Sequence, residues 1–297
     1  NTNARIELPP RGMPRFVPFS AFKDRVSAGC AVEGGVKSPE KMEAPSLNRE
    51  PGRPLPVPQE KPRRGDSQTS SMDELATLRK AVEDDPDNTE NRLALAEACV
   101  IRGDIMGALD QTKYVLQKNA KNTHAINLQG LAHERQGIDE LALQEFERAL
   151  QVDADDVETL LNIGSLRSKL GQYNEAEMNF KRVLELDSQQ MEANFNLGVI
   201  HTRRGLYGKA IQDFERVIDL NPSNIEAYFN LGKAYDHLER YDDAINMFEK
   251  LLNVQPDNDR AFWHLGTLHD KKKDGAKALE MYQHSNRLLT AAKKERH

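Results

Sequence analysis

A period of 34 residues is the feature of this sequence that most constrains its fold. Glycines recur at that spacing, and asparagines stand two residues before three of them. The glycines are Gly130, Gly164, Gly198, Gly232 and Gly266, and the asparagines are Asn162, Asn196 and Asn230. A fixed period of roughly 20 to 50 residues is typical of architectures that stack one small structural unit many times.

The repeated unit can be followed without insertion or deletion from Thr89 almost to the end of the chain. Six units begin at positions 89, 123, 157, 191, 225 and 259. Each unit contains two amphipathic segments of about 13 residues, which favours a pair of helices. In the first four units the turn between them holds Gly103, Gly137, Gly171 and Gly205. Glycine suits this place because a helix end often needs a left-handed backbone.

Further positions of the unit carry recurring residue types. Position 20 is Ala in all six units, and position 24 is Phe or Tyr in units two to six. Pro222 and Pro256 hold position 32 of units four and five. With Gly at position 8, this pattern resembles the tetratricopeptide repeat over residues 89 to about 290. The resemblance implies an all-α fold, a right-handed superhelical solenoid of six helix-turn-helix repeats.

The chain before the repeats differs sharply in composition. Residues 1–70 hold 11 of the 14 prolines and have a net charge of +4, which leaves −10 for the rest. Such a segment cannot bury enough apolar surface to order itself. We therefore expect a long Pro-rich basic arm that is extended and disordered unless it is bound.

A single helix is predicted between the arm and the repeats. Ser71 and Glu74 form a capping box, and the apolar residues that follow lie on one helical face. We expect this capping helix within residues 71–88. The six repeat units then fill residues 89–297, where the last helix extends past the repeat and becomes basic.

Composition excludes several classes of function. The acidic body argues against nucleic-acid binding, which requires clustered Lys and Arg. No apolar run reaches the roughly 18 residues that span a bilayer, so we expect no direct membrane insertion. Cys30 and Cys99 belong to no metal-binding or disulfide pattern, which favours a reducing compartment such as the cytoplasm. Because residue 1 is Asn, removal of a leader and residence in an organelle lumen or a large complex is the alternative.

The sequence contains no pattern typical of catalysis. Phosphate-binding glycine loops, nucleophile elbows and metalloprotease motifs are all missing. His133, His201 and His269 share position 11 of their units, and we expect them to pack between helices. We therefore predict a protein that is not an enzyme and needs no cofactor or metal.

The resemblance implies that the first helix of each unit lines a concave groove. The predicted groove residues are amides or a histidine (Asn127, Asn162, Asn196, Asn230, His264), rings (Phe195, Phe229, Trp263) and cations (Lys169, Arg203, Lys233, Lys271). An Asn side chain both donates and accepts hydrogen bonds, so a row of them can match the backbone of an extended peptide. The row resembles the asparagine ladder of the O-GlcNAc transferase superhelix, although no catalytic domain follows the repeats here.

Plainer explanations of these residues remain open. Asn at position 6 is common in tetratricopeptide repeats, so its recurrence is equally consistent with family ancestry. Phe195 and Phe229 are equally consistent with packing against the next unit. Glu192 and the other acidic residues at position 2 are expected to be first-turn charges that favour the helix dipole.

The residues of this sequence show directly whether it fits one subclass of the family, the repeats that bind chaperone tails. Repeats that hold the carboxylate tails of Hsp70 or Hsp90 need Lys and Asn where unit one has Leu93 and Glu97. They need Lys and Arg where unit three has Glu158 and Asn162. The sequence therefore argues against a clamp for chaperone tails.

These observations lead to one main functional hypothesis and two alternatives. The first is a non-enzymatic adaptor whose groove binds an extended segment of another protein. The second is a structural or assembly subunit that the Pro-rich arm anchors in a larger complex. In the third, the basic arm occupies the groove of its own acidic body.

Overall fold

The structure is a computed structural model that describes residues 66–294, with side chains described for residues 74–292. Thirteen helices and no strand occur in this part of the chain. The predicted arm lies outside the described residues except for its last five, which belong to the first described helix. That helix, α2 (Asp66–Asp84), begins five residues before the predicted cap at Ser71. Residues 66–70 contain neither Pro nor Gly, so nothing in their sequence stops the helix.

Each of the six units folds as two antiparallel helices. The first helices are α3 (Thr89–Arg102), α5 (Thr123–Gln136), α7 (Val157–Lys169), α9 (Met191–Arg203), α11 (Ile225–His237) and α13 (Asp259–Lys271). The second helices are α4 (Ile105–Lys118), α6 (Asp139–Val152), α8 (Tyr173–Leu186), α10 (Tyr207–Leu220), α12 (Tyr241–Val254) and α14 (Gly275–Lys294). At 20 residues α14 is the longest of them, as the sequence predicts for the end of the chain.

The start of every first helix is fixed by the residue immediately before its unit. The side chains of Asn88, Asn122, Asp156, Gln190, Asn224 and Asn258 accept hydrogen bonds from backbone N–H groups of the first turn. These N–H groups have no partner inside the helix, so the caps stabilise each start.

The turn between the two helices requires a left-handed residue in all six units. Gly103, Gly137, Gly171 and Gly205 have φ between 72° and 80°. Units five and six place Glu239 and Lys273 at the same position, with φ of 59° and 62°. A side chain in this conformation costs roughly 1 kcal/mol, so the repeat geometry overrides the local preference of these two residues.

Within a unit the two helices meet where Gly at position 8 faces the ring at position 24. A Cβ added to Gly198 would lie 2.7 Å from Cε1 of Phe214, and the same pairing recurs in units two to six. Unit one has Ala96 and Thr112 at these positions, and both are fully buried. Thr112 is smaller than the ring that the other units have at position 24, and this leaves room for Ala96, which is larger than their Gly. The two helices of unit one therefore stay in close contact through a different pair of residues.

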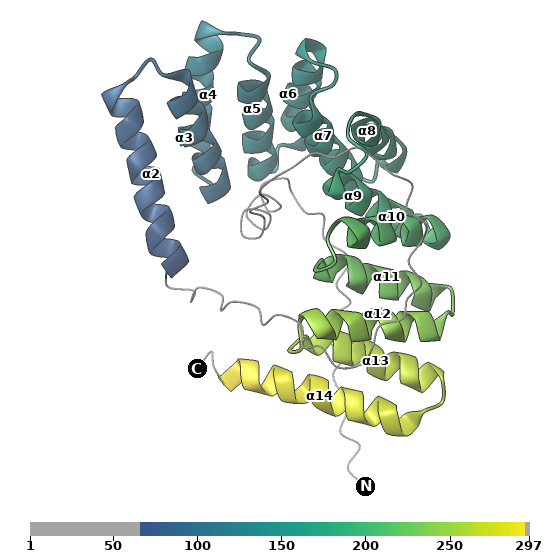
Figure 1. Cartoon of the computed structure of the whole chain (residues 1–297). Helices are drawn as coiled ribbons and strands as arrows, with labels where there is room; N and C mark the ends of the chain where they lie inside the picture. The colour runs from purple at the N-terminus through teal and green to yellow at the C-terminus, as the bar shows by residue number, and fades with distance from the viewer. Residues whose placement is uncertain (1–65, 295–297) are drawn as a thin grey trace, which may run out of the picture.

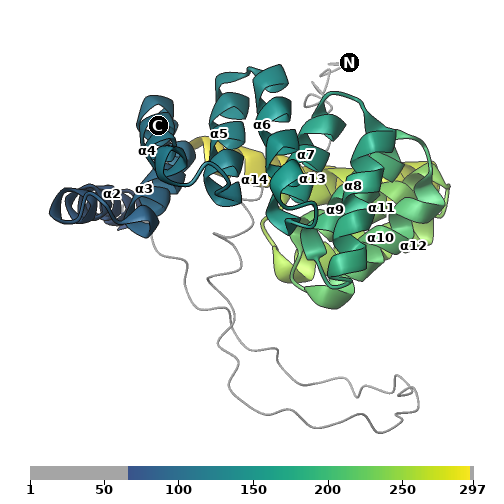
Figure 2. The ribbon, with the colours of Figure 1, turned by 90° about the horizontal axis from the view of Figure 1, so that it is seen from above.

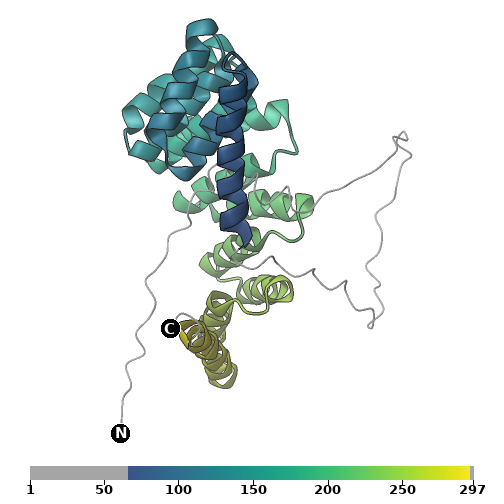
Figure 3. The same ribbon diagram turned by 90° about the vertical axis from the view of Figure 1, so that its left-hand side faces the viewer.

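The helix pairs stack into a curved solenoid. Each helix packs on the next one along the chain, and the path bends from α2 at one end to α14 at the other (Figure 1). The views in Figures 2 and 3 show the same order from two further sides. The largest apolar cluster joins α9 to α13, so units four to six share a continuous core. None of the described helices is both long and apolar enough to cross a membrane.

Candidate functional site

The first helices form the inner face of the curve. Contacts join α3 to α5, α5 to α7, α7 to α9 and α9 to α11, whereas the second helices of neighbouring units have no comparable contact in the described chain. Elements on the inside of a bend lie closer together than those outside it. We call the surface formed by α3, α5, α7, α9, α11 and α13 the inner face.

The predicted asparagines lie along this face, and all four are more than nine-tenths buried. Asn162 on α7 donates its Nδ2 to Oδ1 of Asn127 on α5 at 3.1 Å. Asn196 on α9 donates its Nδ2 to Oγ of Ser165 at 3.4 Å, and Asn230 on α11 donates to the carbonyl of Glu226 at 2.9 Å. The donors of these three amides are therefore engaged within the chain.

Among the described residues, none donates a hydrogen bond to the Oδ1 atom of Asn162, Asn196 or Asn230. The Oδ1 of Asn196 is sealed in the interior, whereas those of Asn162 and Asn230 are not. The Nδ2 of Asn127 and one carboxyl oxygen of Glu192 are also buried without a partner in the described chain. An unsatisfied buried polar atom costs about 1–3 kcal/mol, so this row carries unused capacity for hydrogen bonds.

Glu192 corrects an expectation from the sequence. Its side chain is only 2% exposed, and burial, with the nearby charge of Glu158, raises its pKa to about 8. The carboxyl is therefore mostly protonated at neutral pH and is not a charge that favours the helix dipole. Glu158 instead lies 3.5 Å from Nδ1 of His124 on the neighbouring first helix.

The three predicted rings lie at different depths. Phe195 is 2% exposed and packs edge-on against Phe214 in the core, with ring centres 5.6 Å apart. Phe229 and Trp263 are partly exposed. The accessible aromatic surface of the inner face is therefore confined to units five and six.

The four predicted cations also differ. Lys169 pairs with Asp139 at 2.8 Å, and Lys271 pairs with Asp236 at 2.5 Å. Arg203 is partly buried and also interacts with another group. Lys233 alone has no ion-pair partner among the described residues, and its Nζ lies 6.0 Å from the ring centre of Phe229.

Arg260 on α13 is a residue that the sequence reasoning missed. Its guanidinium lies 4.4 Å from the ring centre of Phe229, and it too has no carboxylate partner in the described chain. Position 2 is Glu in units three to five and Arg in unit six. This reversal was the signal that could have identified Arg260.

His264 completes this group of side chains. Its ring stacks on Phe248 at 5.1 Å and meets the edges of Phe229 and Trp263 at 5.0 Å each. Burial, followed by the charges of Lys233 and Arg260, lowers its pKa to about 4. Burial and the charge of Arg260 also lower the pKa of Lys233. We call Phe229, Lys233, Arg260, Trp263 and His264 the cationic cluster.

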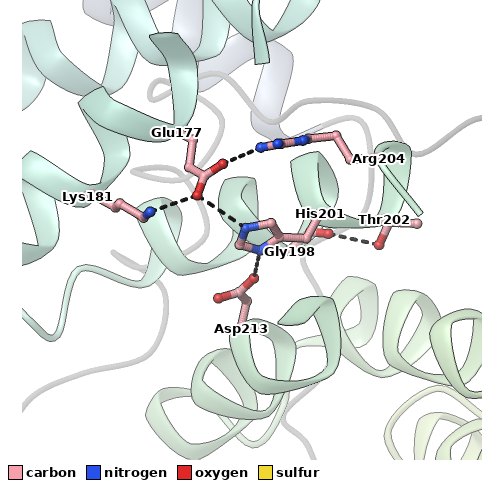
Figure 4. A network of polar contacts seen from close by, with 7 residues as sticks. All are labelled: Glu177, Lys181, Gly198, His201, Thr202, Arg204 and Asp213. Carbon is pink, nitrogen blue, oxygen red and sulfur yellow. Dashed lines mark hydrogen bonds and ion pairs between the residues drawn. The ribbon is translucent and has the colours of Figure 1, made fainter. Parts of the chain in front are cut away.

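A second polar network lies among α8, α9 and α10 (Figure 4). His201 is 5% exposed, with Nδ1 2.5 Å from Asp213 and Nε2 3.7 Å from Glu177. Glu177 also pairs with Lys181 at 2.7 Å and with Arg204. The network joins the second helices of units three and four through His201, which supports the packing role predicted for this histidine.

The described residues contain no cluster of His, Cys, Asp or Glu that could hold a metal ion. What the inner face offers is a set of hydrogen-bond acceptors, partly exposed rings and two cations that have no ion-pair partner among the described residues. These groups suit contact with another polypeptide. The fold and this face define a helical-repeat protein of the interaction class.

Three family models match the chain, and all describe the tetratricopeptide repeat. They cover residues 68–127, 161–225 and 202–267. The chain belongs to the tetratricopeptide repeat family. Solenoids of this family are protein-interaction scaffolds, and this chain is one of them. A comparison with curated proteins found no match.

Solved structures show the same fold. A crystal structure of MamA is 27% identical, with a TM-score of 0.54, over 56% of this chain and 96% of that one. MamA from Desulfovibrio magneticus RS-1, from residue 41 to its end, is 25% identical, with a TM-score of 0.55, over 57% and 96%. YrrB, described as a repeat protein with an unusual peptide-binding site, is 24% identical, with a TM-score of 0.50, over 66% and 97%. The last likeness concerns the fold alone.

Proposed function

We propose that the protein is a non-enzymatic adaptor that binds an extended segment of a partner protein along its inner face. The observation that carries this proposal is that the Oδ1 atoms of Asn162 on α7 and Asn230 on α11 accept no hydrogen bond from any described residue and, unlike Oδ1 of Asn196, are not sealed in the interior. An extended peptide presents backbone N–H groups at regular intervals, and a row of acceptors can bind them without reading the side chains.

The other groups of the inner face support the same function. Phe229 and Trp263 offer apolar area, and large amphipathic rings often carry much of the energy of a protein interface. They lie next to the end of the asparagine row, so one segment could contact both.

The proposal is tested with peptides selected from a random library displayed on phage. Hydrogen–deuterium exchange of the whole chain is then measured with and without a selected peptide. We expect slower exchange in α9, α11 and α13 and no change in α10 and α12. Protection of the second helices instead, or failure to select any peptide, would overturn the proposal.

Substitutions give an independent test. Replacing Asn196, Asn230 and Trp263 together with Ala should weaken binding of a selected peptide at least tenfold. Asn246, exposed on the second helix α12, is the matched control, and Asn246→Ala should leave the affinity unchanged. Equal affinities of the wild type and the triple variant would contradict the proposal, provided that circular dichroism shows both to be folded.

A further inference from the structure

The cationic cluster brings two unpaired positive charges to one ring. The guanidinium of Arg260 lies 4.4 Å from the centre of Phe229, and Nζ of Lys233 lies 6.0 Å from the same centre. The two residues come from neighbouring first helices, α11 and α13. The charge of Arg260 acts on Lys233 and lowers its pKa, because like charges repel each other and partial burial weakens their screening by water.

Carboxylates near the cluster are already engaged. Asp236 acts on the charge of Lys233, yet it pairs with Lys271 at 2.5 Å. Lys169, farther along the inner face, is paired with Asp139 in the same way. Residues 71–297 have a net charge of −10, so carboxylates are in excess. Lys233 and Arg260 are nevertheless without an ion-pair partner among the described residues.

We infer that the cationic cluster binds the carboxylate of an Asp or Glu side chain in the segment that the inner face takes up. This inference rests on the proposed function and specifies the partner as an acidic peptide segment. The fork of N–H groups on Arg260 matches a carboxylate, and Lys233 adds a further donor. The rings of Phe229 and Trp263 flank the site with apolar surface, which strengthens the attraction between opposite charges.

The titration of the cluster is consistent with an anionic ligand. The pKa of His264 falls to about 4 through burial and the charges of Lys233 and Arg260, and the pKa of Lys233 is lowered as well. A bound carboxylate would offset both effects. His264 is neutral at pH 7, so its ring packs against its neighbours without adding a third charge.

The test compares the peptides selected by the wild type with those selected by the Lys233→Gln/Arg260→Gln variant. The random segment is displayed away from any free C-terminus, so only side chains can supply carboxylates. We expect at least threefold enrichment of Asp and Glu at one position for the wild type and none for the variant. The Lys169→Gln variant, whose cation is paired, is the matched control and should keep the enrichment.

The outcomes separate this inference from the proposed function. If both proteins select peptides that protect the inner face but neither selects acidic residues, the inference is wrong and the function stands. If no peptide protects the inner face, the proposed function fails first. Acidic enrichment that persists in the double variant would also overturn the inference.

A second arm uses one selected peptide as a synthetic probe. Changing its enriched Asp or Glu to the amide should weaken binding to the wild type about tenfold and leave binding to the double variant unchanged. Amidation of the C-terminus should have no effect, and a loss of affinity on amidation would assign the site to a terminal carboxylate instead. Removing two like charges should not unfold the protein, and a thermal unfolding curve of the variant checks this.

Discussion

The two halves of the inner face use the same repeat positions for opposite chemistry. At position 2, α9 carries Glu192, whose pKa burial raises to about 8, and α13 carries Arg260, which has no carboxylate partner among the described residues. At position 5, Phe195 is sealed in the core, whereas Trp263 is partly exposed. The backbone of the unit is the same in both halves. The repeat positions that pack the two helices of a unit together therefore fix the fold, and the positions on the inner face are free to differ.

This comparison assigns different tasks to the two halves. Under the proposed function, the half formed by α7 and α9 would contribute neutral amides that suit any backbone, and the half formed by α11 and α13 would contribute charge and rings that select side chains. Four predictions can break or sharpen the distinction.

The largest effect is expected at Glu192. Its folded pKa of about 8 lies above its ordinary value of 4.5, so folding loses stability as pH rises from 4.5 to 8. Glu192→Gln removes that loss and should stabilise the protein by about 4 kcal/mol at pH 8 and by less than about 1 kcal/mol at pH 5. Urea unfolding at the two pH values measures the difference. An equal effect at both values would show that Glu192 is ionised in the folded protein.

The next largest effect is expected at Arg260. Arg260→Glu restores the residue that units three to five carry at position 2 and gives Lys233 a partner of opposite charge. The affinity for an acidic selected peptide should fall about thirtyfold, or about 2 kcal/mol. Fluorescence anisotropy measures the affinity. Since a surface of neutral acceptors is insensitive to this change, a neutral peptide bound through the asparagine row should keep its affinity.

His264 should give the C-terminal half a pH dependence of opposite sign. Its pKa falls from 6.5 to about 4 on folding, so the unfolded chain binds more protons between these values, and stability is lost as pH falls from 6.5 to 4. His264→Asn installs the residue that unit five has at this position and should remove about 2 kcal/mol of that loss. Thermal unfolding between pH 4 and pH 7 tests the sign. A wild type that gains stability from His264 on acidification would contradict it.

The smallest effect concerns the turns rather than the inner face. Units five and six hold Glu239 and Lys273 in the left-handed conformation that Gly supplies in units one to four. Glu239→Gly should therefore stabilise the protein by about 0.5 kcal/mol, whereas Gly205→Ala should destabilise it by about 1 kcal/mol. Thermal unfolding of the two variants compares the halves. Destabilisation by both substitutions would show that the side chain of Glu239 contributes more than its backbone costs.

The sequence predicted the fold well because its period is a local property. Gly198 and Phe214 recur at fixed positions, so the helix pairs follow from the pattern. The start of α2 was not predicted because the capping box at Ser71 lies inside a helix that begins earlier.

The candidate site was harder to predict, because it depends on contacts between units. Lys271 and Lys233 look alike in the sequence. Only the fold shows that Asp236, 35 residues before Lys271, pairs with Lys271, whereas Lys233 has no ion-pair partner among the described residues. Phe195 packs against Phe214 of its own unit, but it is also part of an apolar core that continues into units five and six.

A crystal structure of the protein with a selected acidic peptide would test the central claim most directly. We expect the peptide to lie along α9, α11 and α13, with a backbone N–H group donating to Oδ1 of Asn230. One carboxylate of the peptide should lie within hydrogen-bonding distance of both Lys233 and Arg260. A peptide bound to the second helices, or one whose carboxylates point away from the cationic cluster, would contradict the account.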